Sequence, residues 1–157
     1  MVGAAAIRPL FAEDVTALGA IFSASRRVAM PWLNHAHTPE EEATWLASEA
    51  LPTARVWVAE VAGRPAGFLA RKRQWIMHLY IDPEQRRRGL GTQLMQAARA
   101  ERPPLLQLYV FQRNAAARAF YEKHGFRAVA FGDGSANMEA EPDALYEWRN
   151  PDTDITA

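Results

Sequence analysis

The sequence predicts a mixed α/β fold, in which a sheet is flanked by helices. Short apolar runs of strand length alternate along the chain with segments in which apolar residues recur at helical spacing. Gly and Pro interrupt the chain at most of the boundaries between them. The 157 residues suit one domain with a core of its own, and no repeat, low-complexity run or linker divides them. We therefore expect a single domain over residues 1–157.

The expected elements begin and end with a strand, in the order β-α-α-β-β-β-α-β-α-β-β. Strands are predicted at residues 5–10, 55–61, 66–71, 74–81, 105–111, 126–131 and 145–148. Helices are predicted at residues 13–25, 38–51, 90–102 and 114–124.

Apolar spacing and capping residues predict the two N-terminal helices. The first has an apolar face formed by Val15, Leu18, Ile21 and Phe22. The second begins at Thr38, because Pro39 occupies its first turn and Glu41 lies three residues after the cap. Its apolar side is expected to consist of Trp45, Leu46 and Leu51, and Pro52 ends it.

Alternation and turn residues predict the elements that follow. Val56 and Val58 share one face of a strand, and the turn Gly63-Arg64-Pro65 is expected to return the chain as a hairpin. The helix at 90–102 has a buried stripe formed by Leu90, Leu94 and Ala98. Pro103-Pro104 ends that helix, and the strongly apolar strand at 105–111 follows it.

The most informative stretch is the basic glycine loop Gln85-Arg86-Arg87-Arg88-Gly89-Leu90-Gly91-Thr92, which lies between a strand and a helix. Glycine lets backbone N–H groups approach an anion closely, and the positive end of the helix dipole points at the same place. The arginines add donors that suit phosphate oxygens. The loop therefore predicts a site for a ligand that carries a pyrophosphate.

Other interpretations of this loop are available. A P-loop requires Gly-x-x-x-x-Gly-Lys followed by Ser or Thr, and this string does not occur in the chain. A dinucleotide-binding fingerprint requires a third glycine, which is absent after Gly89 and Gly91. A solvated basic turn that only caps a helix fits the loop by itself equally well.

The composition excludes several classes of protein. Lys and Arg number 18, as do Asp and Glu, so no net charge attracts nucleic acid or a membrane. The chain has no cysteine, which excludes disulfides, thiol nucleophiles and thiolate metal sites. Residues 1–6 lack the charged start of a signal peptide, and no apolar run is long enough to span a membrane. A cytoplasmic protein is expected.

Two motifs resemble the signatures of the GNAT N-acetyltransferase superfamily. Arg86-x-x-Gly89-x-Gly91 resembles its acetyl-CoA signature, Arg/Gln-x-x-Gly-x-Gly/Ala. Residues 114–126 resemble its later motif, in which an Asn opens a helix that carries a Tyr and closes on Gly-Phe. The resemblance spans roughly residues 56–131. Residues 133–148 resemble the end of a bacterial subgroup whose substrate is unassigned.

The resemblance implies a mainly antiparallel central sheet, whose two central strands splay apart after a bulge in the fourth strand. It also implies acetyl-CoA as a cosubstrate. The pantetheine arm would contact the main chain of Leu79, Tyr80 and Ile81. The pyrophosphate would lie on Arg86, Arg87, Arg88, Gly89, Leu90, Gly91 and Thr92. Core packing is the alternative for the side chains of Leu79 and Ile81, and both roles can hold.

The resemblance further implies that Tyr121 protonates the departing CoA thiolate and that Asn114 orders the cofactor arm. The two residues are seven positions apart, so they share one face of a helix. A phenol with a pKa near ~10 is neutral at working pH and can donate a proton. The alternatives are an aromatic core residue for Tyr121 and a helix N-cap for Asn114.

His78 stands where many members of the superfamily carry a glutamate, just before the Leu of the fourth strand. With an ordinary pKa near ~6.5 it is the candidate general base that accepts a proton from the amine. The alternative is a hydrogen-bonded strand residue without a catalytic role.

Candidate acceptor-binding residues are Trp32 and His35, on the irregular segment after the first helix, and Trp75. Four acidic residues could attract a cationic amine, although a solvated loop is the favoured interpretation: Asp133, Glu139, Glu141 and Asp143. The histidines lack the spacing of metal ligands, so no metal is expected.

Together these features predict an acetyl-CoA-dependent N-acetyltransferase. It would transfer an acetyl group to a primary amine, on a small molecule or a peptide, by direct attack in a ternary complex. One alternative is a CoA-binding regulatory module without turnover. Another is a nucleic-acid-binding module, suggested by Arg71-Lys72-Arg73 and by the arginines of the loop, which the neutral net charge disfavours. A homodimer is left open, since dimers are frequent in the superfamily.

Overall fold

The computed structural model describes residues 5–152, which fall into two compact units. The first unit comprises the described residues up to 31 together with residues 35–101, and the second comprises residues 32–34 together with those from 102 onward. Residues 1–4, on which the expected lack of a signal peptide partly depends, lie outside the described range. The single domain over residues 1–157 stays a prediction.

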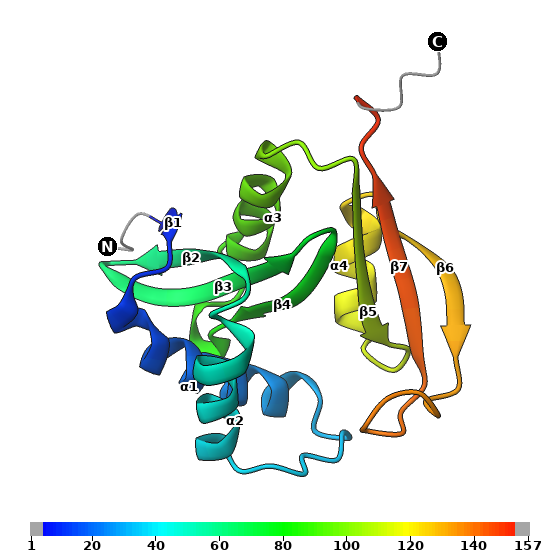
Figure 1. Cartoon of the computed structure of the whole chain (residues 1–157), viewed down its shortest axis with the longest axis horizontal. Coiled ribbons are helices and arrows are strands. Elements are labelled where there is room, and N and C mark those ends of the chain that lie inside the picture. The colour runs from blue at the N-terminus through cyan, green and yellow to red at the C-terminus, as the bar shows by residue number, and fades with distance from the viewer. Residues whose placement is uncertain (1–4, 153–157) are drawn as a thin grey trace. The chain divides into compact units, whose positions relative to one another are not determined.

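The first unit contains four strands and most of the helices of the described chain. Its elements are β1 (Ala5–Pro9), η1 (Ala12–Asp14), α1 (Val15–Ala29), α2 (Pro39–Trp45), η2 (Leu46–Ala50), β2 (Arg55–Val61), β3 (Arg64–Lys72), β4 (Trp75–Ile81), η3 (Pro83–Gln85) and α3 (Leu90–Ala100). The strands pair antiparallel in the order β1-β2-β3-β4. In Figure 1, α1 and α2 lie on one side of these strands and α3 on the other.

Strand alternation gives this four-stranded sheet two buried faces. Val58, Phe68 and Ala70 are fully buried in one cluster with Leu18 and Phe22 of α1. The predicted apolar stripe of α3 is confirmed, because Leu90, Leu94 and Ala98 are each at most 2% exposed. Burial of this kind contributes roughly 1.5–3 kcal/mol for each large side chain.

Several element boundaries in the first unit differ from those predicted from the sequence. The helix predicted at 13–25 runs from Val15 to Ala29, because no helix breaker occurs before Pro31. The turn predicted at 63–65 is the two-residue turn Ala62-Gly63, so Arg64 and Pro65 already belong to β3. Both turn residues have positive φ, 52° and 77°, which matches the twist of a tight hairpin.

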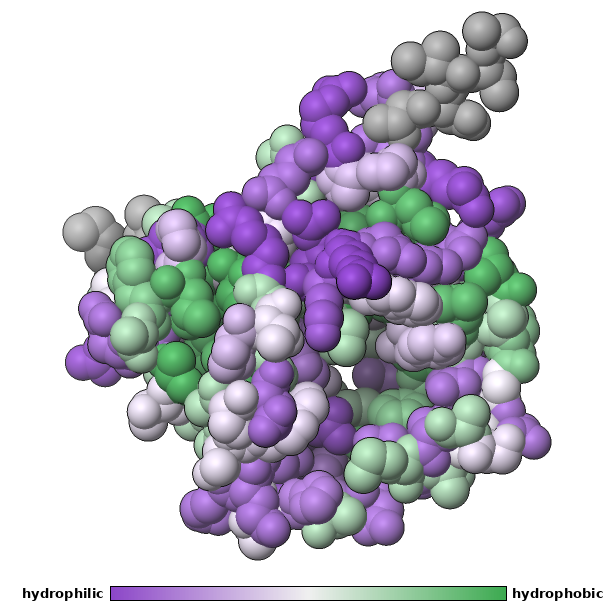
Figure 2. Space-filling model, in the orientation of Figure 1, coloured by the Kyte–Doolittle hydropathy of each residue, from purple (hydrophilic) through white to green (hydrophobic). Residues whose placement is uncertain are grey.

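The apolar side predicted for the second helix is only partly right. Leu46 and Leu51 are buried, whereas the Trp45 side chain is 46% exposed. Its helix changes from α to π geometry at Leu46, which shifts the residues that follow onto a different face. In Figure 2 the surface over α2 is hydrophilic to intermediate, in keeping with the exposed Glu40 and Glu41.

The second unit contains β5 (Leu105–Phe111), α4 (Ala115–Lys123), β6 (Arg127–Gly132) and β7 (Asp143–Arg149). The bounds of β5 are those predicted from the sequence. The strands pair antiparallel in the order β5-β7-β6. Every strand pair within the two units is therefore antiparallel, which confirms the mixed α/β class with a mainly antiparallel sheet. The splayed central strands stay a prediction. Within residues 5–152, none of the helices is long and apolar enough to cross a membrane.

Candidate active site

The basic glycine loop connects η3 to α3 in a conformation that exposes its backbone. Arg87 and Gly89 have left-handed φ values of 67° and 73°. Residues 86–89 are exposed, and Gly89 is the N-cap of α3. A Cβ added at Gly89 would meet no atom within 4 Å, so the space in front of the helix is open.

The backbone amides around the start of α3 lack backbone acceptors. Within residues 5–152, the N–H groups of Arg88, Gly89, Leu90 and Gly91 donate to no other backbone group. The Arg86 Nε atom donates to the Pro83 carbonyl oxygen at 3.1 Å, which holds that guanidinium beside the loop. Free helix-terminal donors and neighbouring arginines suit a phosphorylated ligand. The assignment of the loop residues to a pyrophosphate stays a prediction.

Strand β4 carries a bulge, as the resemblance implied for the fourth strand. Ala70 of β3 faces His78, but the next residue, Arg71, faces Ile76, so Met77 is an extra residue in β4. The Met77 side chain is 52% exposed, and the bulge lies directly before the candidate base.

The residues after the bulge approach β3 closely. Tyr80 pairs with Phe68, and Ile81 pairs with Gly67. A Cβ added at Gly67 would lie 2.6 Å from Ile81 Cδ1 and 2.9 Å from the Tyr80 carbonyl oxygen, so only glycine fits there. Leu79, Tyr80 and Ile81 are half-buried. Their contact with a pantetheine arm stays a prediction.

The imidazole of His78 lies among aromatic rings contributed by three other elements. Its centroid is 5.5 Å from Phe22, 5.6 Å from Trp45 and 6.5 Å from Phe68. Burial, with a smaller contribution from the positive charge of Arg26, lowers the pKa of His78 to about 4. The expected ordinary pKa is therefore wrong. The Nδ1 atom is buried and has no hydrogen-bond partner within residues 5–152, unlike an ordinary hydrogen-bonded strand histidine.

This lowered pKa makes the stability of the protein depend on pH. In the unfolded chain, His78 takes up a proton below its ordinary pKa of 6.5, whereas in the folded protein it does so only near pH 4. The free energy of unfolding should fall as the pH is lowered between these values, by up to about 1.4 kcal/mol per pH unit from this residue. Urea titrations of the wild type and His78→Gln at pH 7 and pH 5 measure the difference. An equal pH dependence in both proteins would contradict the prediction.

In the second unit, Asn114 is the N-cap of α4, because its Oδ1 atom accepts a hydrogen bond from the Ala117 amide at 3.2 Å. Tyr121 is half-buried on the same helix, with its ring centroid 5.4 Å from Phe120 and 5.6 Å from Phe126. The capping and packing roles considered as alternatives are thus present. A half-buried side chain can also contact a ligand. The cofactor-binding role of Asn114 and the acid role of Tyr121 therefore stay predictions.

A polar network that the sequence did not reveal connects α4 to β7. The Arg118 Nε atom donates to the Tyr146 hydroxyl at 2.9 Å, and this hydroxyl donates to the Glu122 carboxylate at 2.6 Å. Tyr146 is fully buried, and burial raises its pKa. No local pattern could have predicted this network, since Tyr146 lies 24 positions from Glu122.

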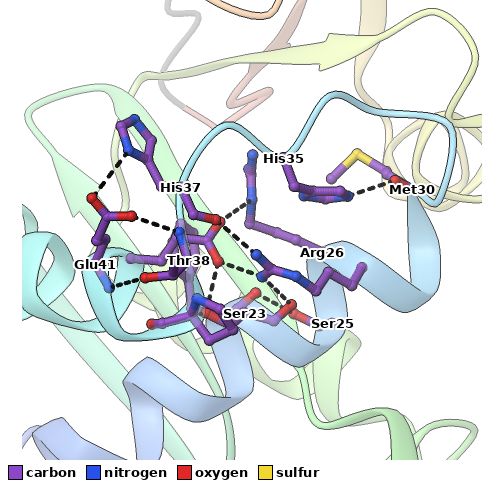
Figure 3. Close-up of polar contacts among 12 residues, drawn as sticks. Ser23, Ser25, Arg26, Met30, His35, His37, Thr38 and Glu41 are labelled. Carbon is purple, nitrogen blue, oxygen red and sulfur yellow. Dashed lines mark hydrogen bonds and ion pairs between the residues drawn. The ribbon is translucent and has the colours of Figure 1, made fainter.

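The candidate acceptor residues fall in different units. Trp32 belongs to the second unit, where its ring lies edge-on to Phe111 at 6.1 Å and the Arg113 guanidinium lies 4.5 Å above it. His35 and Trp75 belong to the first unit and are half-buried. The His35 Nε2 atom lies 2.9 Å from the Met30 carbonyl oxygen, a contact visible in Figure 3.

The acidic C-terminal loop has partners of its own. Glu141 forms an ion pair with Arg113 at 3.4 Å, and the Asp143 carboxylate accepts a hydrogen bond from Asn137 at 3.2 Å. These contacts favour a structural role for the loop. Within residues 5–152, no three His, Asp or Glu side chains come together as a metal ion would require. The expected lack of a metal stays a prediction.

A second network that the sequence did not reveal lies between α1 and α2. The Glu42 carboxylate is 8% exposed and bonds to Ser23 and Arg27. Figure 3 shows the polar contacts of this region, with Ser23, Arg26 and Thr38 labelled. The three consecutive glutamates at the start of α2 gave no sign that one of them is buried.

The bulged β4 and the exposed loop before α3 agree with the class of protein that the two sequence motifs resemble, the acyltransferases. Residues 52–128 match the family model described as "Acetyltransferase (GNAT) domain". The chain belongs to the GNAT family of N-acetyltransferases.

Similar proteins agree with this assignment. The "Peptidyl-lysine N-acetyltransferase YjaB" of Salmonella typhimurium is 34% identical over 118 residues, which cover 74% of this chain and 79% of that protein. The solution structure of apo YjaB from Escherichia coli matches with a TM-score of 0.77 and 27% identity, over 92% of this chain and 97% of that one. The PaiA N-acetyltransferase of Thermoplasma acidophilum, solved in complex with coenzyme A, matches with a TM-score of 0.73 and 20% identity. The match covers 94% of this chain and 99% of that one. The chain is an N-acetyltransferase.

Proposed function

We propose that this N-acetyltransferase takes its acetyl group from acetyl-CoA and transfers it to a primary amine by direct attack in a ternary complex. The observation that supports the proposal is the loop before α3, where the amides of residues 88–91 donate to no backbone group of residues 5–152 and lie beside exposed arginines. A pyrophosphate needs such a set of donors. The coenzyme A complex of the PaiA enzyme supports the proposal at the level of the fold.

The residues of this chain would share the proton transfers of the reaction. Acetyl-CoA, when bound, supplies a thioester that an amine nitrogen attacks. His78 would accept the proton that the nitrogen loses as the N–C bond forms. Its lowered pKa keeps the imidazole neutral at physiological pH, and it also makes His78 a weaker base than an ordinary histidine. A main-chain N–H of residues 79–81 would donate to the carbonyl oxygen. Tyr121 would give its phenolic proton to the sulfur as the C–S bond breaks and regain one from water.

The acceptor would be an amine on a small molecule or a peptide, contacted by Trp32, His35 and Trp75. The relative YjaB is named a peptidyl-lysine N-acetyltransferase, which makes a lysine side chain the first acceptor to test. Direct transfer fits a chain that has no cysteine to form a thioester with the acyl group. We further propose that the protein acts in the cytoplasm, without a nucleic-acid or membrane partner. Light scattering distinguishes a homodimer from a monomer.

The test is a thiol-release assay with acetyl-CoA against lysyl peptides, peptide N-termini, polyamines and amino sugars. We expect release of CoA that depends on the amine, and initial-rate plots that intersect, as a ternary complex requires. Acetyl-CoA binding in calorimetry without transfer to any amine would favour the CoA-binding regulatory module instead. Failure to bind acetyl-CoA at all would contradict the whole proposal.

A further inference from the structure

Glu42 is a carboxylate that α2 buries against α1. Its Oε1 atom accepts a hydrogen bond from Ser23 Oγ at 2.9 Å and another from Arg27, and its Oε2 atom lies 3.7 Å from Arg26 Nε. A buried charge is strongly unfavourable unless several partners compensate it. Burial by itself would raise the pKa of Glu42, but the hydrogen bonds of Arg27 and Ser23 and the two arginine charges outweigh it, and the pKa is lowered. Glu42 is therefore ionised at neutral pH.

The two arginines that share this charge reach in different directions. Arg27 donates from Nη2 to the His37 carbonyl oxygen at 2.9 Å, in the irregular chain that precedes α2. Arg26 donates from Nη1 to the Tyr80 hydroxyl of β4 at 3.3 Å. The Arg26 guanidinium also lies 5.2 Å from the centroid of Phe22, the ring that contacts His78. One carboxylate thus connects the 35–38 segment (residues 35–38) to the strand that carries the candidate base.

His35, at the start of the 35–38 segment, has an acceptor atom without a donor. Its Nε2 atom lies 2.9 Å from the Met30 carbonyl oxygen, which can only accept, so Nε2 carries the hydrogen. In this tautomer Nδ1 presents a lone pair. This atom is buried and has no hydrogen-bond partner among the described residues. A buried acceptor without a donor is unfavourable in the free protein and suits a ligand that brings an N–H group.

We propose that Glu42 is a positioning residue: through Arg27 it holds the 35–38 segment so that His35 Nδ1 accepts a hydrogen bond from the N–H of the acceptor amine. This inference depends on the proposed function for the identity of the ligand. Glu42 itself touches neither substrate. In Figure 3, the labelled His35 and Arg26 lie on the same side of α1 as Thr38, where the 35–38 segment enters α2.

The test is steady-state kinetics of Glu42→Gln on the intact protein, with Glu40→Gln as a matched control. Glu40 is exposed in the first turn of the same helix. For Glu42→Gln we expect the KM for the amine to rise about tenfold, the value of one lost charged hydrogen bond, while the KM for acetyl-CoA and kcat change less than about twofold. Glu40→Gln should resemble the wild type. Equal rises in both KM values, or a fall in kcat alone, would overturn the proposal. Either result would indicate that the substitution disturbs the fold as a whole.

A measurement without turnover separates this inference from the proposed function. In ¹⁵N NMR spectra of the imidazole groups, the wild type should show His35 as the Nε2–H tautomer, and Glu42→Gln should show averaged signals for His35. Arg27→Met serves as a second variant if Glu42→Gln folds poorly, since it removes the bond to the His37 carbonyl and should give the same averaging. Unchanged His35 signals in a folded variant would overturn the positioning role. If the wild type shows sharp tautomer signals but acetylates no amine, the proposed function is refuted, whereas the positioning role of Glu42 is kept.

Discussion

Tyr121→Phe is expected to lower kcat by about 10²–10⁴-fold, the usual contribution of a general acid, with little change in acetyl-CoA binding. Phenylalanine fills the same space beside Phe120 and Phe126, so the helix packing is kept. The substitution removes the phenolic hydroxyl, and with it the proton that the sulfur would receive. The measurement is the rate of thiol release at saturating substrates, together with calorimetric binding of acetyl-CoA.

Tyr146→Phe provides the contrasting variant for this experiment. Its hydroxyl is buried between Arg118 and Glu122, so its removal should lower the thermal stability by leaving both partners short of a hydrogen bond. Tyr121→Phe keeps the ring contacts with Phe120 and Phe126, and its expected loss is in kcat. Full turnover by Tyr121→Phe would end the general-acid assignment and leave Tyr121 as a packing residue.

The second large effect is expected at the start of α3. Gly89→Val should weaken acetyl-CoA binding by about 100-fold, because a branched side chain would occupy the open space in front of the free amides and strain a left-handed residue. The loss of two charge-assisted hydrogen bonds accounts for a change of this size. Calorimetry with CoA measures it directly.

Gly63→Val is a closely matched control. Gly63 has a φ of 77° and, like Gly89, has no atom within 4 Å of an added Cβ, but it lies in the β2–β3 turn. Both variants therefore suffer the same backbone strain and should lose similar thermal stability. Only Gly89→Val should lose affinity for CoA. An equal loss of affinity in both variants, or in neither, would contradict the role of the loop.

Much of the local structure could be predicted from the sequence, because its causes lie within a few residues of one another. Thr38 and Glu41 cap each other reciprocally in the structure, at 3.1 and 2.9 Å, as their spacing predicted. Asn114 opens α4, and the strand at 105–111 has its predicted bounds. The loop motif was found by the same means, since a strand, two glycines and a helix start are all adjacent in the chain.

Only part of the candidate site could be predicted from the sequence. The position of His78 was predicted, but its lowered pKa depends on Phe22, Trp45 and Phe68, which three separate elements supply. Likewise, Tyr146 becomes a buried partner of α4 only through the packing of β7. These environments are built from residues tens of positions apart, and no local pattern encodes them.

The order of the elements and the loop that is proposed to hold the cosubstrate could be predicted from the sequence, because glycine freedom, capping and periodicity are local properties. The family followed from the resemblance of the two motifs. Which charged groups are buried became visible only in the folded chain. Glu40, Glu41 and Glu42 are consecutive carboxylates, yet of the three only Glu42 is buried, and Ser23 and Arg27 donate hydrogen bonds to it. The free energy of a charge depends on what surrounds it, and those surroundings exist only once the chain has folded.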